Sequence, residues 1–229
     1  MPQGAFITFE GSEGCGKSTQ VLRLAARLEQ VGMRTLVTRE PGGTAIGEKI
    51  RDLLQFAPES FAMTPEAELL LFEASRSQLV RETIQPALTQ GTVVISDRFF
   101  DSTTVYQGVA RKLPPGIVET LNAFAIGSAR PDVTFILDLD VETARARMLR
   151  RVRPVGVTDR MEQEPIEFYE RVCEGYRDLA KKEPERFIVL DGRQTPDAIE
   201  NEIWQALTSR LPYFAFLPQS EIRNPKSEI

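Results

Sequence analysis

Histidine is absent from all 229 residues of this sequence, which narrows the chemistry that the chain can perform. Histidine is the side chain that most often carries protons near neutral pH, and it is a frequent zinc ligand. Its absence excludes histidine-dependent catalytic triads and most zinc sites. The only cysteines are Cys15 and Cys173, and neither belongs to a metal-binding spacing, so we expect a reducing, cytoplasmic environment.

Long apolar runs and an excess of positive charge are also missing. No stretch approaches the about 18 apolar residues of a membrane span, and the first residues lack the pattern of a signal peptide. The formal net charge is −5, with 28 basic and 33 acidic residues, which argues against nucleic acid as a partner. We therefore expect a cytoplasmic protein that binds small molecules, with no membrane and no nucleic-acid partner.

Hydrophobic residues make up 41% of the chain, enough for a substantial core, and they fall into alternating strand and helix patterns. The expected strands cover 5–9, 35–38, 92–96, 133–139 and 187–190. The expected helices cover 17–31, 46–54, 65–89, 117–125, 141–151, 166–182 and 196–211. This alternation predicts an α/β fold with a five-stranded parallel sheet and helices on both faces. Periodicity ends at about residue 212, which leaves a tail over 212–229 whose packing the sequence does not decide.

A phosphate-binding loop occupies residues 11–18, where the letters GSEGCGKS satisfy G-x-x-x-x-G-K-[ST]. The motif follows an expected strand and opens an expected helix, which is the context that it requires. Its glycines let successive backbone N–H groups point at one anion, and the helix adds its positive end. The expected triphosphate-binding residues are Gly11, Ser12, Glu13, Gly14, Cys15, Gly16, Lys17, Ser18 and Thr19. Lys17 would reach the terminal phosphates as a catalytic group, and Ser18 would ligate Mg²⁺.

Charged residues directly follow two other expected strands. Arg39 and Arg98 lie at the carboxyl edge of the sheet, where open α/β sheets bind ligands, and guanidinium groups suit phosphate. A surface salt bridge is the alternative for each arginine. Asp97 either organises Mg²⁺ or forms an ion pair that orients Arg98.

Six segments, in order, resemble bacterial thymidylate kinase. They are FITFEGSEGCGKSTQ, TREPGGT, LLFEASRSQ, DRFFDSTTVYQG, ARPDVTFILDL and DRMEQE. The resemblance implies a P-loop nucleoside monophosphate kinase-like fold over 1–211, with a short lid at about 150–162. It implies phosphorylation of dTMP to dTDP with ATP and Mg²⁺, in dTTP biosynthesis, by a homodimer.

The resemblance also implies how dTMP is bound. Phe72 and Arg76 share one helix face, and the family uses this pair to stack on thymine and to donate to a ring carbonyl. Taken alone, Phe72 is more typical of a core residue. Glu13 would accept from the 3′-hydroxyl, and Arg39 and Arg98 would lie near the acceptor phosphate. The residues expected to line the sugar and base are Ser102, Thr103, Tyr106 and Gln107, with the Tyr106 ring disfavouring a ribose hydroxyl.

The catalytic arginine is expected outside the phosphate loop, because no residue over 12–15 is basic. Arginines flank the loop over 153–159, and such a loop can close over a triphosphate. We expect Arg151 or Arg153 to be catalytic, with Arg160 as the next candidate. Arg147 is expected to stack on adenine. Arg145 and Arg150 are expected to lie on a solvated helix face.

Two other functions stay open from the residues alone. One is a kinase of another nucleoside monophosphate or of a deoxynucleoside, which a substrate panel would reveal. The other is a GTPase-type switch, although the N-K-x-D guanine motif of that class is not found in the sequence.

Overall fold

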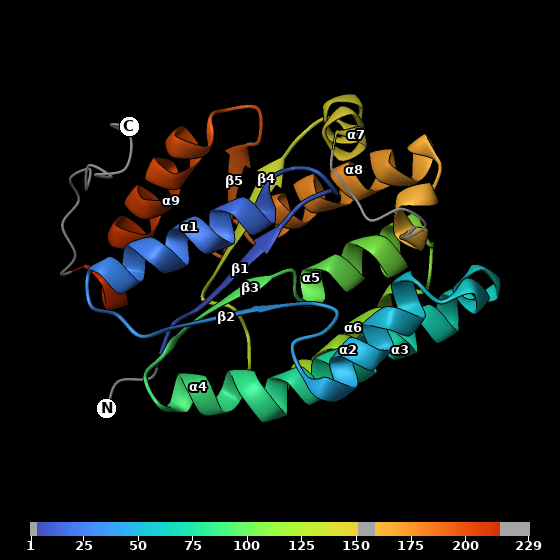
Figure 1. Ribbon diagram of the computed structural model, residues 1–229, viewed down its shortest axis with the longest axis horizontal. Coiled ribbons are helices and arrows are strands. Elements are labelled where there is room, and N and C mark those ends of the chain that lie inside the picture. Colours follow the sequence, from blue (N-terminus) through green and yellow to red (C-terminus); the bar gives the residue numbers. More distant parts are fainter. Residues whose placement is uncertain (1–3, 151–158, 216–229) are drawn as a thin grey trace.

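A parallel sheet forms the centre of the computed structural model, which describes residues 4–150 and 159–215 (Figure 1). Its strands are β1 (Phe6–Glu10), β2 (Thr35–Arg39), β3 (Val93–Asp97), β4 (Val133–Asp138) and β5 (Phe187–Asp191). They are arranged in the order β2-β3-β1-β4-β5, and each neighbouring pair is parallel. The expected five-stranded parallel sheet is confirmed.

Helices connect the strands in the alternation expected from the sequence. They are α1 (Lys17–Gln30), α2 (Ala45–Gln55), α3 (Pro65–Leu79), α4 (Gln85–Thr89), α5 (Phe100–Thr103), α6 (Pro115–Ile126), α7 (Val141–Leu149), α8 (Ile166–Lys182) and α9 (Pro196–Arg210). Two π-helical segments, η2 (Val80–Ile84) and η3 (Thr104–Ala110), extend α3 and α5, and η1 (Pro58–Ala62), η4 (Arg160–Gln163) and η5 (Pro212–Phe214) are short 3₁₀ turns. The helix expected over 65–89 is thus α3, η2 and α4 in succession. No helix in the described part of the chain is both long and apolar enough to cross a bilayer.

Threonine caps explain where several helices begin. The Thr64 hydroxyl accepts from the amide of Ala67 at the start of α3, and Thr195 accepts from Ala198 at the start of α9. Each threonine is followed by proline, which suits the first helical position because its missing N–H would have no partner there. These capping signals involve only neighbouring residues. The sequence therefore predicts the first residues of α3 and α9 to within one residue of their observed positions.

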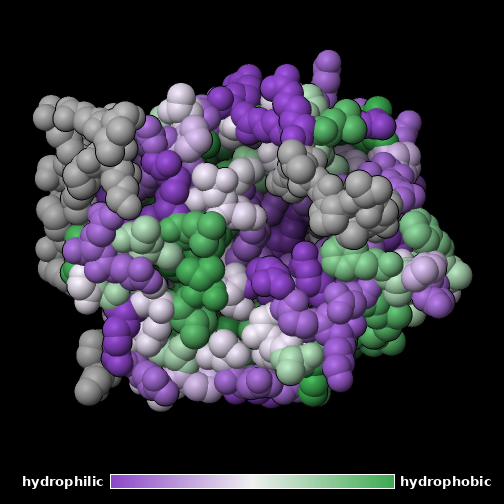
Figure 2. All heavy atoms as spheres, viewed as in Figure 1, coloured by the Kyte–Doolittle hydropathy of each residue, from purple (hydrophilic) through white to green (hydrophobic). Residues whose placement is uncertain are grey.

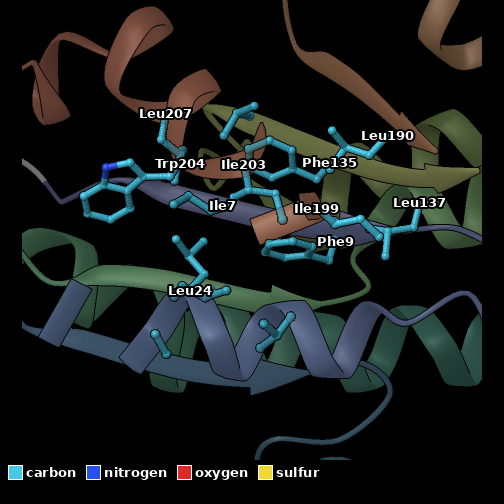
Figure 3. Packing of buried hydrophobic residues seen from close by; sticks show 14 of the residues in the cluster. Ile7, Phe9, Leu24, Phe135, Leu137, Leu190, Ile199, Ile203, Trp204 and Leu207 are labelled. Carbon is cyan, nitrogen blue, oxygen red and sulfur yellow. The ribbon is translucent and has the colours of Figure 1, made fainter. Parts of the chain in front are cut away.

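The two faces of the sheet bury alternate residues of its strands. Ile7 and Phe9 of β1 pack against α1 and α9, and Figure 3 shows Trp204 and Leu207 of α9 within this cluster. Phe6 points to the opposite face, where it packs with residues of α3, η2 and α4. This period of two is the side-chain repeat of a β-strand, and a strand covered on both faces reads as a continuous apolar run.

The carboxyl ends of three strands place polar side chains along one edge of the sheet. Arg39 of β2 is paired in register with Asp97 of β3, which in turn is level with Phe9 of β1. Glu10 follows Phe9 directly. A third hydrophobic cluster joins η3 and α8 to β4 and β5. At the other end of the chain, Phe214 is buried against α1 and α9, so the described start of the 212–229 tail is packed.

Candidate functional site

The phosphate-binding loop joins β1 to α1 at the carboxyl edge of the sheet. Gly11, Gly14 and Gly16 all have positive φ, at 134°, 76° and 104°. A Cβ on Gly14 would lie 2.5 Å from the carbonyl oxygen of Ala144, so the loop requires glycine there. The Lys17 ammonium donates to the carbonyls of Gly11 (3.1 Å) and Ser12 (2.8 Å), which places its charge inside the loop.

Cys15 fills space within this loop. Its thiol is buried and free, and its sulfur lies 3.6 Å from the Lys17 ammonium nitrogen. Thr19 is exposed on the first turn of α1. These positions agree with a loop whose backbone, rather than its side chains, faces an anion.

Ser18 and Asp97, the two residues predicted to ligate magnesium, lie in direct contact. The Ser18 hydroxyl donates to Asp97 Oδ2 at 2.5 Å, across from the first turn of α1 to the end of β3. Hydroxyl and carboxylate oxygens are hard ligands, and Mg²⁺ is commonly held by one or two of them together with phosphates and water. The residues present therefore fit Mg²⁺ bound beside the triphosphate.

A cavity of about 370 Å³ opens beside the loop, and Figure 2 shows a hollow with hydrophilic side chains around it. Its lining includes residues from the phosphate loop, the ends of β2 and β3, and the helices α2, α3, α5 and η3. The lining residues are Glu13, Gly16, Lys17, Ser18, Arg39, Glu40, Pro41, Arg51, Gln55, Phe56, Phe72, Asp97, Arg98, Ser102, Thr103, Tyr106, Gln107, Asp159, Met161 and Glu162. The structure thus brings all but one of the expected acceptor-binding residues to one cavity, and Arg76 is the exception.

Four cationic side chains among the described residues line this cavity: Lys17, Arg39, Arg51 and Arg98. Arg39 donates to Glu48 Oε2 at 2.7 Å and is half exposed. Arg51 donates to the carbonyl of Pro41, and burial together with the charge of Arg39 lowers its pKa. The lining also includes the carboxylates Glu13, Glu40, Asp97, Asp159 and Glu162, so these cations suit an anionic ligand that contacts them directly. Arg51 was not expected from the sequence, because it lies mid-helix without a motif.

Arg98 occupies the centre of the site. It follows β3 with φ 72°, a left-handed conformation that is uncommon for a residue with a side chain. Its guanidinium donates to Gly11 O (3.0 Å), Glu13 Oε1 (2.7 Å), Ser102 Oγ (3.0 Å), Tyr106 Oη (3.2 Å) and Tyr176 Oη (3.2 Å). Burial acts to lower its pKa, but Glu13 and the neighbouring groups outweigh that effect, and its pKa is raised. The guanidinium is therefore a fixed positive charge between the loop and the cavity.

Glu10 binds two of the side chains that contact Arg98, namely Ser102 and Tyr176, and the sequence analysis did not predict a role for Glu10. Its fully buried carboxylate accepts hydrogen bonds from Phe99 N (2.8 Å), Ser102 Oγ (2.6 Å) and Tyr176 Oη (2.7 Å). Burial and the charge of Asp101 raise its pKa. A charged residue directly after a buried strand was the available signal. Tyr176, on α8, has no such local signal.

Glu40 is a second buried carboxylate, and it lines the cavity. Its Oε2 accepts two hydrogen bonds from Arg76, at 2.6 and 2.8 Å. Its Oε1 has no hydrogen-bond partner among the described residues. Burial raises the pKa of Glu40 to about 7, and the positive charge of Arg76 offsets this only in part. Folding therefore favours the protonated form of Glu40.

The raised pKa of Glu40 predicts a pH-dependent stability. The folded-state pKa of about 7 lies above the ordinary glutamate pKa of 4.5, so the folded protein binds more protons than the unfolded chain between these values. Stability should fall as the pH rises through this window. The free energy of unfolding of Glu40→Gln minus that of the wild type should increase by up to about 1.4 kcal/mol for each pH unit in this window. Urea unfolding between pH 4.5 and 8 measures this difference, and a difference independent of pH would contradict it.

Phe72 of α3, Thr103 of α5 and Gln107 of η3 also line the cavity. Arg76, expected to contact a base, is only 1% exposed and does not line the cavity. Its donors bind Glu40 Oε2, Glu73 Oε1, Asn122 Oδ1, Thr103 Oγ1 and the Phe99 carbonyl. A guanidinium has five N–H donors, so these contacts occupy it fully. A hydrogen bond from Arg76 to a ligand stays a prediction, and it requires an exchange of partners.

The expected lid arginines are only partly described. Arg151 and Arg153 lie outside the described residues. Arg160 is buried, where it donates to Glu68 Oε2 and to the carbonyl of Leu54, and the structure does not place it in the cavity. Arg147 donates to the carbonyl of Gly192, directly after β5, at 2.9 Å. Its stacking on adenine stays a prediction.

Comparison with known proteins agrees with this geometry. The family model described as thymidylate kinase matches residues 9–203. The chain is 47% identical over 211 residues to a protein named thymidylate kinase from Geobacter sulfurreducens, covering 91% of this chain and 99% of the relative. It is 44% identical over 210 residues to one from Deinococcus radiodurans, covering 92% and 99%.

A solved structure is similar over the same extent. The crystal structure of thymidylate kinase from Ehrlichia chaffeensis has a TM-score of 0.72 and 35% sequence identity to this chain, covering 90% of this chain and 99% of the solved one. Similarity in sequence and in fold therefore points to one family.

Proposed function

The chain belongs to the thymidylate kinase family and phosphorylates dTMP to dTDP with ATP and Mg²⁺, and we propose that the cavity beside the phosphate loop is where dTMP binds. The observation that carries this proposal is that Lys17, Ser18, Asp97 and Arg98 line the same cavity as Phe72 and Gln107. Groups suited to phosphate and groups suited to a base thus line one space.

The acceptor phosphate is proposed to lie at the Arg39 and Arg98 end. Arg98 donates to the carbonyl of Gly11, so a phosphate bound by its guanidinium would also lie close to the loop. Such a phosphate would replace some of the five hydrogen bonds that Nη1 and Nη2 of Arg98 make in this structure. Guanidinium groups pair with phosphate oxygens as a fork, and two anions can approach only where cations neutralise them. Arg98 thereby bridges donor and acceptor.

The sugar and base are proposed to extend toward Phe72 and Gln107. Phe72 would stack on the thymine, and the ring of Tyr106 would crowd a 2′-hydroxyl, which favours a deoxynucleotide. Glu13 Oε1 accepts from Arg98 at 2.7 Å. We propose that the same carboxylate accepts from the 3′-hydroxyl. Ser102 and Thr103 complete this part of the lining.

The donor is proposed to bind along the loop over 11–18. The backbone N–H groups and the start of α1 attract the phosphates, and Lys17 stabilises charge on the transferring group. Mg²⁺, held by Ser18 and by Asp97, would neutralise negative charge on the triphosphate. The acceptor oxygen needs no general base, because a phosphate monoester is ionised near neutral pH. We propose direct in-line transfer, with Arg151 or Arg153 adding positive charge.

A structure of the protein with dTMP and ADP tests this placement. We expect the base against Phe72 and the phosphate within hydrogen-bond distance of Arg98. If the base instead lay against the phosphate loop, the assignment of the cavity would be wrong. A kinase for another monophosphate is the second candidate, but the family of this chain favours dTMP.

A homodimer is proposed through α3 and α6. Both helices expose large apolar side chains on neighbouring surfaces: Leu70 of α3 is 56% exposed, and Ile117 and Phe124 of α6 are 54% and 74% exposed. Figure 1 shows α2, α3 and α6 together on one side of the sheet. Apolar groups gathered in this way favour burial against a second copy. A cytoplasmic location is also proposed, and both cysteines are free, as a reducing compartment would keep them.

Phe124→Asp should weaken this dimer. A carboxylate placed in an apolar interface loses both the burial of the ring and the hydration of its charge, so the dissociation constant should rise at least ~10-fold. Light scattering after size exclusion measures the mass across a dilution series. Leu149→Asp, at an 82% exposed site on α7, is the matched control and should leave the mass unchanged. A Phe124→Asp protein with the wild-type dissociation constant would contradict the α3–α6 interface.

A further inference from the structure

A buried carboxylate fixes the orientation of the Gln107 side chain. Glu68, on α3, is 1% exposed, and its Oε1 accepts a hydrogen bond from Gln107 Nε2 at 2.6 Å. Gln107 is itself 1% exposed and lines the cavity. Its carbonyl oxygen, Oε1, accepts no hydrogen bond that is recorded from the described residues. The amide therefore has its NH₂ group held in the protein while its oxygen is left for a ligand.

The orientation follows from the charge of Glu68. An ionised carboxylate only accepts hydrogen bonds, so the side of Gln107 that faces it must be the NH₂ group. Burial acts to raise the pKa of Glu68, but hydrogen bonds from Arg111 and Gln107 and the charge of Arg160 outweigh it, and the pKa is lowered. Glu68 is thus ionised at neutral pH, and a flip of the Gln107 amide would bring two acceptors together.

We propose that Glu68 is a positioning residue for base specificity, which makes Gln107 present an acceptor to the ring nitrogen of the base. Thymine and uracil carry an N–H donor at N3, whereas cytosine has an acceptor at this atom. An acceptor held at this point pairs with the first two bases and repels the third. A site built to hydrogen-bond one partner rejects the analogue that lacks it, because buried groups are left unpaired. The inference rests on the proposed binding of the base at Phe72 and Gln107.

The arginines beside Glu68 predict what an amide at position 68 would do. Arg111 donates to both carboxylate oxygens of Glu68, at 3.1 and 3.2 Å, and Arg160 donates to Oε2. In Glu68→Gln, the carbonyl oxygen at position 68 would take the place of Oε2, which accepts from both arginines. Its NH₂ group would take the place of Oε1, where it would face Gln107 and lose the hydrogen bond from Arg111 Nε. Gln107 would then flip, and its NH₂ group would face the base.

The test is the ratio of kcat/KM for dTMP to kcat/KM for dCMP. In Glu68→Gln this ratio should fall ~10- to 100-fold, while the ratio of dTMP to dUMP stays within about twofold, because both bases have the N3 donor. Glu164→Gln is the matched control. Glu164 accepts from Arg111 at 2.5 Å and has no recorded contact with Gln107, so its loss removes a carboxylate from the same cluster and should leave both ratios unchanged.

An exchange of the two side chains supplies a rescue. In the double variant Glu68→Gln/Gln107→Glu, the carboxylate at position 107 accepts from the amide at position 68 and still offers an oxygen to the base. The preference for dTMP over dCMP should recover at least ~10-fold relative to Glu68→Gln. The double variant keeps one carboxylate and one amide in the pair. It can therefore be measured in place of Glu68→Gln if that single variant does not fold.

The outcomes separate this inference from the proposed function. A wild-type protein that does not prefer dTMP to dCMP would overturn both. Glu68→Gln with lower activity but an unchanged ratio of kcat/KM for dTMP to that for dCMP would overturn the role of Glu68 alone. Loss of a merely structural residue lowers kcat/KM for all substrates by a similar factor. A double variant that folds but shows no preference for dTMP would also overturn it.

Discussion

Lys17→Met is expected to lower kcat by ~10²- to 10³-fold, with a much smaller change in the KM for dTMP. The ammonium of Lys17 lies within the phosphate loop, against the carbonyls of Gly11 and Ser12, and Lys17 lines the cavity beside the loop. A charge that neutralises the transferring group acts mainly in the transition state, so its removal lowers kcat more than acceptor binding. Methionine retains the length of the stem and removes the charge together with the hydrogen bonds to Gly11 and Ser12.

Coupled measurement of ADP release at saturating dTMP gives kcat for this variant. Lys181→Met is the matched control, because Lys181 is exposed on α8 and its recorded partner is Asp178. It should retain the wild-type rate. A Lys17→Met protein with normal kcat would show that the loop does not hold the transferring phosphate.

Arg98→Gln is expected to lower kcat/KM for dTMP by ~10³-fold, through both a higher KM and a lower kcat. Arg98 is proposed to bind the acceptor phosphate, and loss of two charged hydrogen bonds at about 1.5–3 kcal/mol each gives this magnitude. The substitution also leaves Glu13 without its 2.7 Å partner, which adds negative charge beside the phosphate. The KM for ATP should change far less.

Initial rates at varied dTMP and fixed ATP, and the converse, separate these two effects. Arg130→Gln removes an exposed arginine that is paired with Glu183, and it should leave the kinetics unchanged. If Arg98→Gln raised the KM for ATP and left that for dTMP unaltered, Arg98 would belong to the donor site instead.

The elements that the sequence predicts best are those with local signals. The phosphate loop needs glycines at set positions and a strand and helix on either side, and all of these are consecutive in the chain. Arg39 and Asp97 could be placed together in advance, because both end strands of a parallel sheet, and they are in fact paired in register. Their roles in binding stay predictions.

Contacts between distant segments could not be predicted in this way. Tyr176 donates a hydrogen bond to Glu10, 166 residues away in the sequence, and Gln107 donates one to Glu68, 39 residues away. No periodic pattern in the sequence predicts either contact. The helical segment α5 and η3 was also missed. Its run of Thr103, Thr104 and Val105 is β-branched and favours extended structure locally, but packing against α8 overrides this preference.

Arg76 shows a limit of a different kind. Its position four residues after Phe72 correctly predicts a shared helix, but not the four side chains and one carbonyl that occupy its guanidinium. Hydrogen-bond partners from α6, from α5 and from the end of β2 are set by tertiary packing. The resemblance to a family supplied a role for Arg76, whereas the structure gives it a buried network.

The most direct test of the dTMP cavity is an ADP-release assay with ATP, Mg²⁺ and each of dTMP, dUMP, dCMP and dGMP, repeated with Phe72→Ala. We expect dTMP to give the highest kcat/KM. Loss of the ring at position 72 should raise the KM for dTMP ~5- to 150-fold, by the ~1–3 kcal/mol of a base stacked on an aromatic side chain. Higher kcat/KM for dCMP or dGMP, or an unchanged KM for dTMP in Phe72→Ala, would contradict the account.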